Sequence, residues 1–450
     1  MDFNRLKHIY FLGIGGIGMS ALARYFKAIG KEVSGYDKTS TNLTRALEDE
    51  GITIHYEDWG AAVIQHINPA ESLVVYTPAI PKDFGELNAI QNAGFALYKR
   101  AQVLGLITEN SFGIGVAGTH GKTTTSTMLA HVINQSIGCN AFLGGISTNY
   151  NSNLILNTAS EISVLEADEF DRSFLQLKPK AGVLTSIDAD HLDIYGDTKH
   201  IVDGFQAYVN LIAEEGFVLM HHSIPLTASC KILRYGLSEN ANIAGLNPRM
   251  KDGFFWMDVR AHGTLWTDMK LGVPGLHNAE NALAVIGVCL ELGLNEQQIR
   301  TGLESFLGVK RRFEYIIRRA DLVYVDDYAH HPSEIHALVS SIRLMYPNRK
   351  VTGIFQPHLF SRTRDFLDGF AAELSKLDEV ILMPIYPARE MPIDGITSEA
   401  VRKMMTLPDV KIMTHHEVVA HFKYHRPDLL LTIGAGDIDL IVQPLKELLS

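Results

Sequence analysis

The chain has 450 residues, a length that predicts about three domains of ordinary size. Hydrophobic residues make up 46% of it and charged residues 20%, the balance of a globular protein with full cores. Its 51 acidic and 40 basic residues give a net charge of −11, and no dense run of Lys and Arg occurs. This charge argues against binding to duplex nucleic acid or to anionic membranes.

The three cysteines, Cys139, Cys230 and Cys289, are far apart and lack C-x-x-C spacing. A scattered, odd number favours buried apolar thiols in a reducing cytosol over a disulfide framework, so we expect a cytoplasmic protein. No apolar run has the length of a bilayer span, so we expect no membrane insertion. The apolar stretch from Ile9 to Ala23 could mimic a signal peptide, but its regularly placed glycines favour a strand, a turn and a helix. The expected assembly is a monomer or a homodimer.

The first segment predicts a doubly wound nucleotide-binding unit. A strand at 8–12 leads into a glycine turn and a helix to about residue 29, and a second strand at 32–36 ends at Asp37. The turn supplies the candidate residues Gly13, Gly15, Gly16, Gly18, Met19 and Ser20. Its G-x-G-x-x-G pattern would let the backbone approach a diphosphate, while Asp37 could accept hydrogen bonds from ribose hydroxyls. The alternative is a tight turn that only packs a helix on a strand.

Two more strands are expected in this segment, at 72–76 and near 95–98. Thr77, Pro78 and Ala79 follow the first of them. Ligands of open α/β sheets lie beyond the C-terminal ends of the strands, so these three residues are candidates for the same site.

The second segment begins with a phosphate loop between a strand at 111–116 and a helix at 126–135. Its candidate residues are Gly118, Thr119, His120, Gly121, Lys122, Thr123 and Thr124. Backbone N–H groups at a helix N-terminus attract anions, Lys122 would reach the outer phosphates, and the Thr123 hydroxyl would bind Mg²⁺. Val116 stands where the strict pattern has glycine, and the alternative is an ordinary glycine turn that caps a helix.

Two later strands of this segment end in acidic residues. The strand at 162–166 leads into Glu166-Ala-Asp-Glu169, and the strand at 182–187 leads into Asp188-Ala-Asp-His191-Leu-Asp193. Carboxylate and imidazole groups there suit Mg²⁺ near phosphate oxygens, and we favour Glu166 and His191 as metal ligands. Helix capping is at least as good an explanation for the other acidic residues, which are Asp168, Glu169, Asp171, Asp188 and Asp193.

Residues 216–272 read as short strands separated by turns, at 216–220, 241–245, 254–259 and 263–271. They predict a small antiparallel insert that covers one side of the domain. A helix to about residue 292 follows, with Asn278 and Asn281 one turn apart on one face. Their amides could read an adenine edge, or they could simply be polar residues at a helix start.

The third segment, after Gly308, predicts another doubly wound α/β unit. Polar residues again follow its strands: Asp327, His330 and His331 come after a strand at 322–326, and His358, Arg362 and Arg364 after a strand at 351–355. Pro332 is well placed to begin a helix that ends near Met345. Strands at 379–383 and 429–433 complete the alternation.

These motifs, in this order, resemble those of the Mur ligase family, which builds the peptide of bacterial cell-wall precursors. The resemblance runs from Gly13 to Asp437 and is greatest to the alanine-adding branch. It implies an α/β fold of three domains. These are a Rossmann-like UDP-sugar-binding domain at 1–107, a central phosphate-loop ATPase domain at 108–309 with a small antiparallel insert, and a Rossmann-like C-terminal domain at 310–450 that binds the amino acid and closes on ATP.

The resemblance also implies roles for single residues. Those expected to be catalytic are Lys122, Glu166, His191 and Arg312. Two Mg²⁺ ions would be held by Thr123, Glu166 and His191. Beyond the phosphate loop, ATP would contact Asn278, Asn281, Arg312 and Asp327, and the amino acid would contact His330, His358 and Arg362. The turn at 13–20 would bind a UDP-sugar rather than a nicotinamide cofactor.

The implied reaction joins L-alanine to the lactyl carboxylate of UDP-N-acetylmuramate, using ATP and passing through an acyl phosphate, in peptidoglycan precursor synthesis. Gln206 stands where some family members have a carbamylated lysine, so no carbamate is expected. Leu359 stands where this branch often has arginine, which makes Arg362 the stronger candidate for the amino-acid carboxylate, whereas Arg364 is as well explained by a solvated helix face. The base for the amine stays open among His330, His331 and His358.

Three other interpretations compete with this one. A recycling ligase would add a whole murein peptide to UDP-N-acetylmuramate, but its first loop differs from Gly-Gly-Ile-Gly-Met-Ser. A nicotinamide-dependent oxidoreductase built on Gly13–Gly18 would leave the phosphate loop unexplained. A catalytically inactive UDP-sugar-binding protein would have no need of Lys122, Glu166 and His191.

Overall fold

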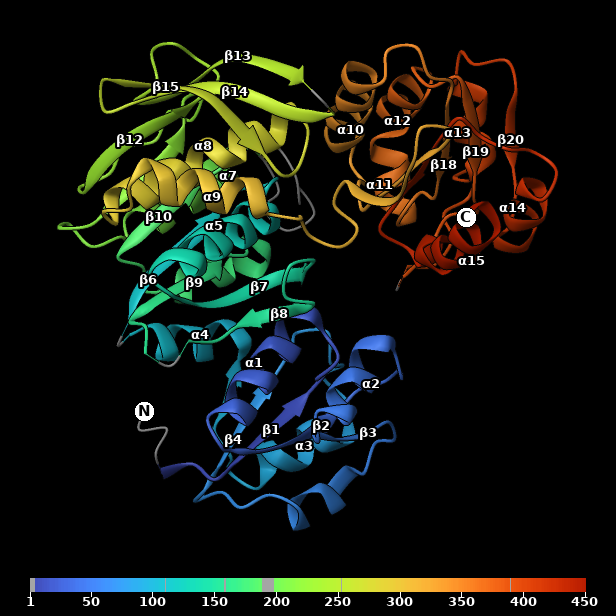
Figure 1. Cartoon of the computed structure of the whole chain (residues 1–450). Helices are drawn as coiled ribbons and strands as arrows, with labels where there is room; N and C mark the ends of the chain where they lie inside the picture. The colour runs from blue at the N-terminus through green and yellow to red at the C-terminus, as the bar shows by residue number, and fades with distance from the viewer. Residues whose placement is uncertain (1–4, 110, 158, 188–197, 252, 389) are drawn as a thin grey trace. The chain divides into compact units, whose positions relative to one another are not determined.

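The computed structural model describes residues 5–109, 111–157, 159–187, 198–251, 253–388 and 390–450 (Figure 1). The described residues form three β-sheets, and the chain divides into two compact units. The first unit comprises Met1–Leu246, Asp258–Met269 and Glu280–Phe306, and the second comprises Asn247–Met257, Lys270–Ala279 and Leu307–Ser450. An α/β fold with three sheets agrees with the prediction from sequence.

The first sheet has five parallel strands in the order β3-β2-β1-β4-β5. The strands are β1 (His8–Leu12), β2 (Glu32–Tyr36), β3 (Thr53–His55), β4 (Ser72–Tyr76) and β5 (Leu97–Lys99). Helices α1 (Ile17–Ala28), α2 (Asn42–Asp49) and α3 (Gly85–Asn92) lie between them in the chain, and α4 (Arg100–Thr108) follows β5. The chain runs outward from β1 through β2 to β3 and then returns to β4 on the other side of β1. The switch point between β1 and β4 is where open sheets of this kind bind ligands.

The second sheet has ten strands in the order β15-β14-β13-β12-β11-β10-β6-β9-β7-β8. Its first seven strands along the chain are β6 (Phe112–Ala117), β7 (Asn140–Ser147), β8 (Ser152–Ile155), β9 (Ile162–Glu166), β10 (Ala181–Leu184), β11 (Phe217–His221) and β12 (Lys231–Gly236). The central strands pair in parallel, and β7 and β8 form an antiparallel pair at one edge. Helices α5 (Lys122–Ser136), α7 (Thr198–Val209), α8 (Leu276–Glu291) and α9 (Glu296–Ser305) accompany this sheet (Figure 1).

The antiparallel insert is smaller than the sequence predicted. A strand at 216–220 was expected in it, but the observed strand β11 at 217–221 pairs in parallel with β10. Strand β12, which was not predicted, extends the same parallel series. The remaining strands, β13 (Ile243–Lys251), β14 (Phe254–Ala261) and β15 (Thr264–Leu271), are neighbours in the sheet joined by two-residue connections, which only antiparallel strands permit. His262 and Gly263 between β14 and β15 both have positive φ, of 48° and 79°, as a type I′ hairpin turn requires.

The third sheet lies in the second unit and has the order β16-β17-β21-β18-β19-β20. Its strands are β16 (Glu314–Arg318), β17 (Val323–Asp327), β18 (Val351–Phe355), β19 (Glu379–Leu382), β20 (Val410–Ile412) and β21 (Leu429–Ile433). Only β16 runs antiparallel to its neighbour; the other pairs are parallel. Helices α10 (Pro332–Met345), α11 (Phe360–Asp365), α12 (Leu367–Leu374), α13 (Ser398–Met404), α14 (His415–Phe422) and α15 (Val442–Leu449) complete this doubly wound unit.

The first two sheets share one hydrophobic core. Helix α1 packs against β7 and β8, and Leu22 and Phe26 of α1 belong to the same buried cluster as Phe142 of β7 and Leu165 of β9. The glycine turn after β1 and the phosphate loop after β6 are therefore carried by elements that pack directly on one another within the first unit.

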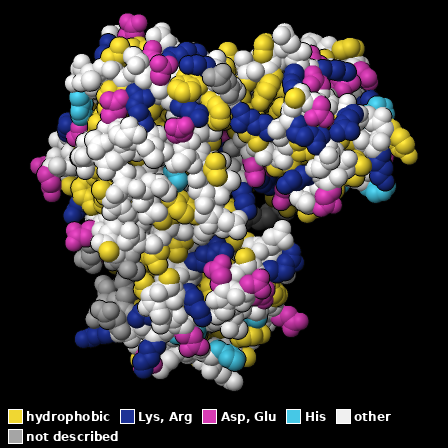
Figure 2. Space-filling model, in the orientation of Figure 1, with side chains coloured by type: hydrophobic (Ala, Val, Ile, Leu, Met, Phe, Trp, Pro, Cys, Tyr) yellow, Lys and Arg dark blue, Asp and Glu magenta, His cyan; other side chains and the backbone are white. Residues whose placement is uncertain are grey.

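The three cysteines are free and buried, as the sequence predicted. Acidic and basic side chains are mixed over the face seen in Figure 2. Among the described residues, no helix is long and apolar enough to cross a bilayer.

Candidate active site

The phosphate loop connects β6 to α5, which begins at Lys122, four residues earlier than the sequence predicted. Two of its glycines are required by the backbone. Gly118 has φ +140°, and a Cβ there would lie 2.0 Å from the Thr185 hydroxyl. Gly121 has φ +80°, and a Cβ there would lie 2.9 Å from Asn281 Oδ1. Only glycine allows these close approaches together with positive φ.

Two hydroxyl residues that sequence reasoning missed fix the shape of this loop. The Ser186 hydroxyl lies 2.8 Å from the Thr119 hydroxyl and accepts a hydrogen bond from the His120 N–H at 2.9 Å. The Thr185 hydroxyl donates to the carbonyl oxygens of His120 and Ala117. The available signal was their place directly after β10, which neighbours β6 in the parallel sheet.

Lys122 points back over its own loop. Its Nζ donates to the Gly118 carbonyl at 2.6 Å and lies 2.7 Å from the Glu169 carboxylate. Burial alone would lower the pKa of Lys122, but Glu169, with Asp168 and Glu166, more than compensates, and the pKa is raised. Lys122 is therefore a fully charged ammonium at the start of α5. Glu169, which the sequence analysis treated as at least as well explained by helix capping, is instead the ion-pair partner of this lysine.

Glu166, at the end of β9, has an oxygen suited to a cation. Its Oε2 is buried and has no hydrogen-bond partner within the described part of the chain. Gly144 of β7 faces this carboxylate, because a Cβ at Gly144 would lie 2.1 Å from Oε2. A buried carboxylate oxygen without a partner is costly unless a cation or a donor meets it, so Glu166 fits the predicted role of metal ligand.

The other predicted metal ligands are only partly described. Thr123 lies in the first turn of α5, next to Lys122. His191 lies outside the described residues, as do Asp188 and Asp193 and the side chain of Asp171. Within the described part of the chain, no group of three or more His, Cys, Asp or Glu side chains could hold a metal ion.

The two asparagines of α8 are both buried. Asn281 packs against the phosphate loop at Gly121, and its contact with adenine stays a prediction. The Asn278 amide donates to the Pro274 carbonyl at 2.7 Å, which ties it to the first turn of its own helix.

The glycine turn after β1 lies at the switch point of the first sheet. Gly13 has φ +86°, and a Cβ there would lie 2.4 Å from the Thr77 methyl group, so the structure brings the turn and the loop after β4 together. Pro78 and Ala79 are exposed beside them. Asp37 accepts a hydrogen bond from the Gly15 N–H at 2.7 Å and thus shapes the turn itself.

The last residues of the predicted turn differ in exposure. Gly16 is exposed, whereas Met19 and Ser20 are buried. The Ser20 hydroxyl donates to the Ile17 carbonyl at 2.9 Å, so it is engaged within α1.

Arg100, the first residue of α4, is a further residue that sequence reasoning missed. Its side chain lies across Gly18, where a Cβ would be 2.1 Å from Nη1. Its guanidinium is 3.8 Å from the Asp168 carboxylate, a long ion pair. A cation beside a helix N-terminus interacts unfavourably with the helix dipole. An anion bound there would interact favourably with both the Arg100 guanidinium and the N-terminus of α1. No local pattern indicated Arg100, because α4 reaches Gly18 only through the packing of the first sheet.

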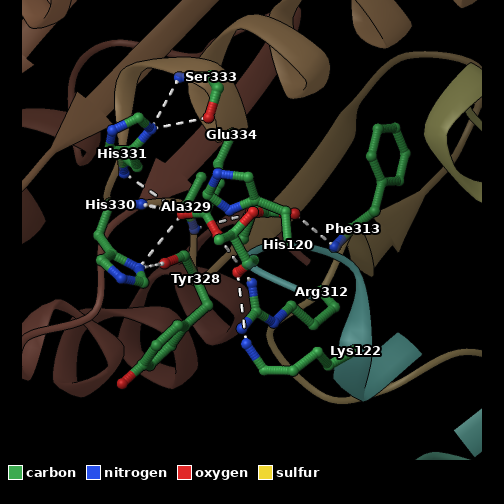
Figure 3. A network of polar contacts seen from close by, with 12 residues as sticks. His120, Lys122, Arg312, Phe313, Tyr328, Ala329, His330, His331, Ser333 and Glu334 are labelled. Carbon is green, nitrogen blue, oxygen red and sulfur yellow. Dashed lines mark hydrogen bonds and ion pairs between the residues drawn. The ribbon is translucent and has the colours of Figure 1, made fainter. Parts of the chain in front are cut away.

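In the second unit, Asp327 at the end of β17 joins two loops. Its carboxylate accepts from the Phe313 N–H at 2.7 Å and from the Ala329 N–H at 2.8 Å. Burial raises the pKa of Asp327 to about 6, against the opposing charge of Arg312. Arg312 itself lies over the Tyr328 ring, 5.0 Å from its centroid, and 3.6 Å from the Glu334 carboxylate (Figure 3).

The three residues predicted to bind the amino acid lie close together. The His330 and His358 rings are 6.2 Å apart, and Arg362 of α11 is near enough to influence both of them electrostatically. Burial, together with His330 and Arg362, lowers the pKa of His358 to about 4, so this imidazole is neutral at pH 7. His331 instead caps α10, where its Nδ1 lies 2.7 Å from the Ser333 hydroxyl (Figure 3).

Two further residues of this segment, Leu359 and Arg364, lie next to or within α11. Leu359 adopts a positive φ of 70° directly before α11, and its N–H donates to the Tyr386 carbonyl at 2.9 Å. Arg364 is exposed and pairs with Asp365 at 2.7 Å, which favours the interpretation of a solvated helix face.

The fold and the loop at 118–124 define a phosphate-loop α/β protein with a second glycine-rich loop on its first sheet. Three family models match it in succession: the Mur ligase family catalytic domain over residues 8–111, the Mur ligase middle domain over 116–289, and the Mur ligase glutamate ligase domain over 311–436. The chain belongs to the Mur ligase family.

Its relatives are similar over their full length. The chain is 46% identical over 451 residues to the UDP-N-acetylmuramate–L-alanine ligase of Flavobacterium johnsoniae, covering 100% of this chain and 99% of the relative. It is also 46% identical over 457 residues to the enzyme of the same name from Cytophaga hutchinsonii, covering 100% and 98%. The crystal structure of UDP-N-acetylmuramate–alanine ligase from Thermotoga maritima superimposes with a TM-score of 0.84 at 27% identity, covering 98% of each chain.

Proposed function

We propose that this chain is an ATP-dependent ligase that joins L-alanine to the lactyl carboxylate of UDP-N-acetylmuramate, a step of peptidoglycan precursor synthesis. The observation that carries the proposal is that one compact unit holds both a phosphate loop with a charged lysine and a second glycine loop for a nucleotide. The substrates are those named for its full-length relatives at 46% identity.

In this proposal each domain binds a different substrate. Residues 1–107 bind the UDP-sugar through the turn at 13–20 together with Asp37 and the loop at 77–79. Residues 108–309 bind ATP through the phosphate loop, and the asparagines of α8, Asn278 and Asn281, contact the adenine. Residues 310–450 bind L-alanine through His330, His358 and Arg362, and supply Arg312 and Asp327 to ATP.

The first chemical step brings two anions together. An oxygen of the lactyl carboxylate attacks the γ-phosphorus, the bond to the bridging oxygen breaks, and ADP leaves with an acyl phosphate remaining. Charge neutralisation should therefore dominate this step. Lys122 supplies a positive charge within the phosphate loop, and the N–H groups at the start of α5 add the dipole of a fifteen-residue helix.

Two Mg²⁺ ions complete the proposed site, held by Thr123, Glu166 and His191. The unpartnered buried oxygen of Glu166 supports this assignment for the described residues. When bound, the ions would neutralise phosphate charge.

The second step forms the amide. The amine of L-alanine attacks the acyl carbon, the C–O bond to phosphate breaks, and one proton leaves the nitrogen. His358 is neutral at pH 7 because its pKa is about 4, so it can accept a hydrogen bond from the ammonium but is a weak base. His330, whose pKa burial also lowers, is held by the Tyr328 carbonyl at 2.9 Å and by Glu334.

The free, buried cysteines fit a reducing compartment, and we propose the cytoplasm as the place of this reaction. The nicotinamide alternative leaves the phosphate loop and its charged lysine without a role. The recycling alternative uses the same sugar and differs only in the acceptor.

Phosphate release with ATP, Mg²⁺ and UDP-N-acetylmuramate, measured with different acceptors, tests the proposal. Release with L-alanine but not with a murein tripeptide supports it, whereas release only with the tripeptide would assign the chain to the recycling reaction. Lys122→Ala should abolish release while UDP-sugar binding persists. If that variant also lost UDP-sugar binding, the proposed division between the domains would be wrong.

A further inference from the structure

One buried amide joins the start of α1 to the β7–β8 hairpin. Asn153 of β8 has no exposed surface. Its Nδ2 donates to the Ile17 carbonyl at 2.5 Å and to the Ser20 hydroxyl at 2.9 Å. Its Oδ1 accepts from Arg24 Nη1 at 2.6 Å. Every polar group of this side chain is thus used to hold the first turns of α1.

Only an amide can make this set of contacts. Aspartate lacks the two donors, and leucine has the shape but no polar atom. Either replacement would remove hydrogen bonds that tie α1 to β8, each worth about 0.5–1.5 kcal/mol. Arg24 is itself fixed, because its Nη2 lies 2.7 Å from the Glu50 carboxylate. The position of the Asn153 side chain relative to α1 is therefore fixed by Ile17 and Ser20 at its nitrogen and by Arg24 at its oxygen.

The same hairpin reaches the proposed metal carboxylate. In β7, Gly144 lies against Glu166, so closely that a Cβ would be 2.1 Å from Oε2. Also in β7, Phe142 packs on Tyr25 of α1, with ring centroids 5.4 Å apart. One antiparallel hairpin is thus in contact with the helix that follows the sugar-nucleotide turn and with the carboxylate beside the phosphate loop.

We infer that Asn153 is a positioning residue, which sets the place of the sugar-nucleotide turn relative to the phosphate loop through the β7–β8 hairpin. This inference rests on the proposed function. The lactyl carboxylate of a sugar bound at α1 must meet the γ-phosphate of ATP bound at α5, with reacting atoms about 3–3.5 Å apart. A misplacement of about 1 Å can cost about a hundredfold in rate.

The inference predicts a distinctive kinetic signature. Each nucleotide site consists mainly of its own loop, so loss of Asn153 should leave the binding of each nucleotide nearly intact. Instead, the two bound nucleotides should be displaced relative to one another, and this displacement should lower kcat. A role confined to stability would lower the melting temperature without lowering kcat of the folded enzyme at saturation.

The test uses the full chain with Asn153→Asp and Asn153→Leu. Calorimetry gives the Kd of UDP-N-acetylmuramate and of a non-hydrolysable ATP analogue, and phosphate release gives kcat with all substrates saturating. We expect both Kd values to stay within about threefold and kcat to fall at least about tenfold, as for displaced reactants.

Asn140→Ala is the matched control. This residue is in the same hairpin and makes comparable hydrogen bonds, from its Nδ2 to the Ser160 carbonyl at 3.2 Å and to its Oδ1 from the Asn157 N–H at 2.9 Å, but it makes neither of the Asn153 contacts to α1. Its kcat should stay near that of the unchanged protein. If the Asn153 variants fold poorly, Arg24→Ala removes one of the three contacts and should give a smaller loss of kcat in the same direction.

An unchanged kcat in folded Asn153 variants would overturn the inference, and so would a loss that lies wholly in Kd. Failure of the proposed function looks different, because the unchanged protein would then release no phosphate with L-alanine.

Discussion

The ammonium of Lys122 lies 2.7 Å from the Glu169 carboxylate, and the two side chains are only 13% and 2% exposed. The lysine that we propose to bind phosphate is thus already neutralised by a group of the protein. ATP must compete with Glu169 for this charge, and binding must leave Glu169 with a different partner. We therefore expect the ion pair to set part of the energy of nucleotide binding.

We predict that Glu169→Gln strengthens the binding of a non-hydrolysable ATP analogue. The glutamine keeps the shape of the side chain but removes the competing charge, so the free protein is destabilised more than the complex in which Lys122 meets phosphate. We expect Kd to fall about tenfold, which corresponds to about 1.4 kcal/mol, together with a lower melting temperature of the free protein. Calorimetry and thermal unfolding measure the two effects.

Asp168→Asn is the control for this experiment, because Asp168 pairs with Arg100 at 3.8 Å. It removes the same charge from the neighbouring position and should change the Kd of the analogue less. Equal or weaker binding by Glu169→Gln would show that the carboxylate does not compete with phosphate.

Gly144→Ala should inactivate the enzyme without unfolding it. The added methyl group would lie 2.1 Å from Glu166 Oε2 and must displace this carboxylate, which is a side chain and able to move. We expect kcat to fall at least about tenfold, with a raised Mg²⁺ requirement, because Glu166 is the proposed metal ligand. Phosphate release as a function of Mg²⁺ concentration measures both.

Gly113→Ala, in strand β6 of the same sheet, is the matched control. A Cβ there meets its nearest atom at an ordinary 3.6 Å, so activity should be retained. Full activity of Gly144→Ala at low Mg²⁺ would mean that the position of Glu166 is unimportant for the reaction.

Arg100→Gln should weaken UDP-sugar binding and leave ATP binding alone. The guanidinium lies across Gly18 at the start of α1, where the proposed diphosphate would also be attracted. Loss of a hydrogen bond to a charged group costs about 1.5–3 kcal/mol, so the Kd of UDP-N-acetylmuramate should rise at least about tenfold. Lys178→Gln, which removes an exposed cation paired with Glu109, should change neither Kd. A Kd unaffected by Arg100→Gln would place the diphosphate elsewhere.

The sequence predicted those parts of the fold and site that depend on local patterns. Gly118 and Gly121 could be identified because a phosphate loop needs glycine at fixed spacing between a strand and a helix. The place of Glu166 near Lys122 could be predicted because parallel strands deliver side chains to one edge of the sheet, whereas its role as a metal ligand stays a prediction. Strands at 8–12, 32–36, 351–355 and 429–433 have the bounds that were predicted.

The residues that were missed depend on contacts between distant segments. Arg100 reaches Gly18, and Asn153 reaches Ile17, only after α4 and the β7–β8 hairpin have packed on α1. Glu169 differs from its neighbours only through the burial that pairs it with Lys122. The strand at 217–221 was wrongly assigned to the antiparallel insert for a similar reason. A short apolar strand followed by a turn has the same sequence pattern in parallel and antiparallel sheets.

The final prediction concerns pH and the buried carboxylate of Asp326 in β17. Burial raises the pKa of Asp326 to about 6, against the opposing effects of Arg311 at 3.4 Å and of the Thr432 hydroxyl. The unfolded chain should titrate near the ordinary value of 3.8. Between these two values the folded state holds more protons than the unfolded state, so this group makes folding less favourable as pH rises, and the loss is complete above about pH 6.

Asp326→Asn should therefore gain melting temperature relative to the unchanged protein as pH rises from about 4 to about 6, and the difference should then level off. A shift of about two pKa units sets an upper limit of about 3 kcal/mol for the effect, and part of it is offset because Arg311 loses its partner. Asp321→Asn is the control, since Asp321 is exposed and hydrogen bonds and charge from Arg319 lower its pKa from 3.8. Its effect on stability has the opposite sign and develops below this pH range, so between about pH 4 and 6 the control should show almost no change. Calorimetry across this pH range decides the matter: a difference that shrinks with rising pH would mean that Asp326 is stabilised as a carboxylate by Arg311, and that burial is not the dominant influence on its charge.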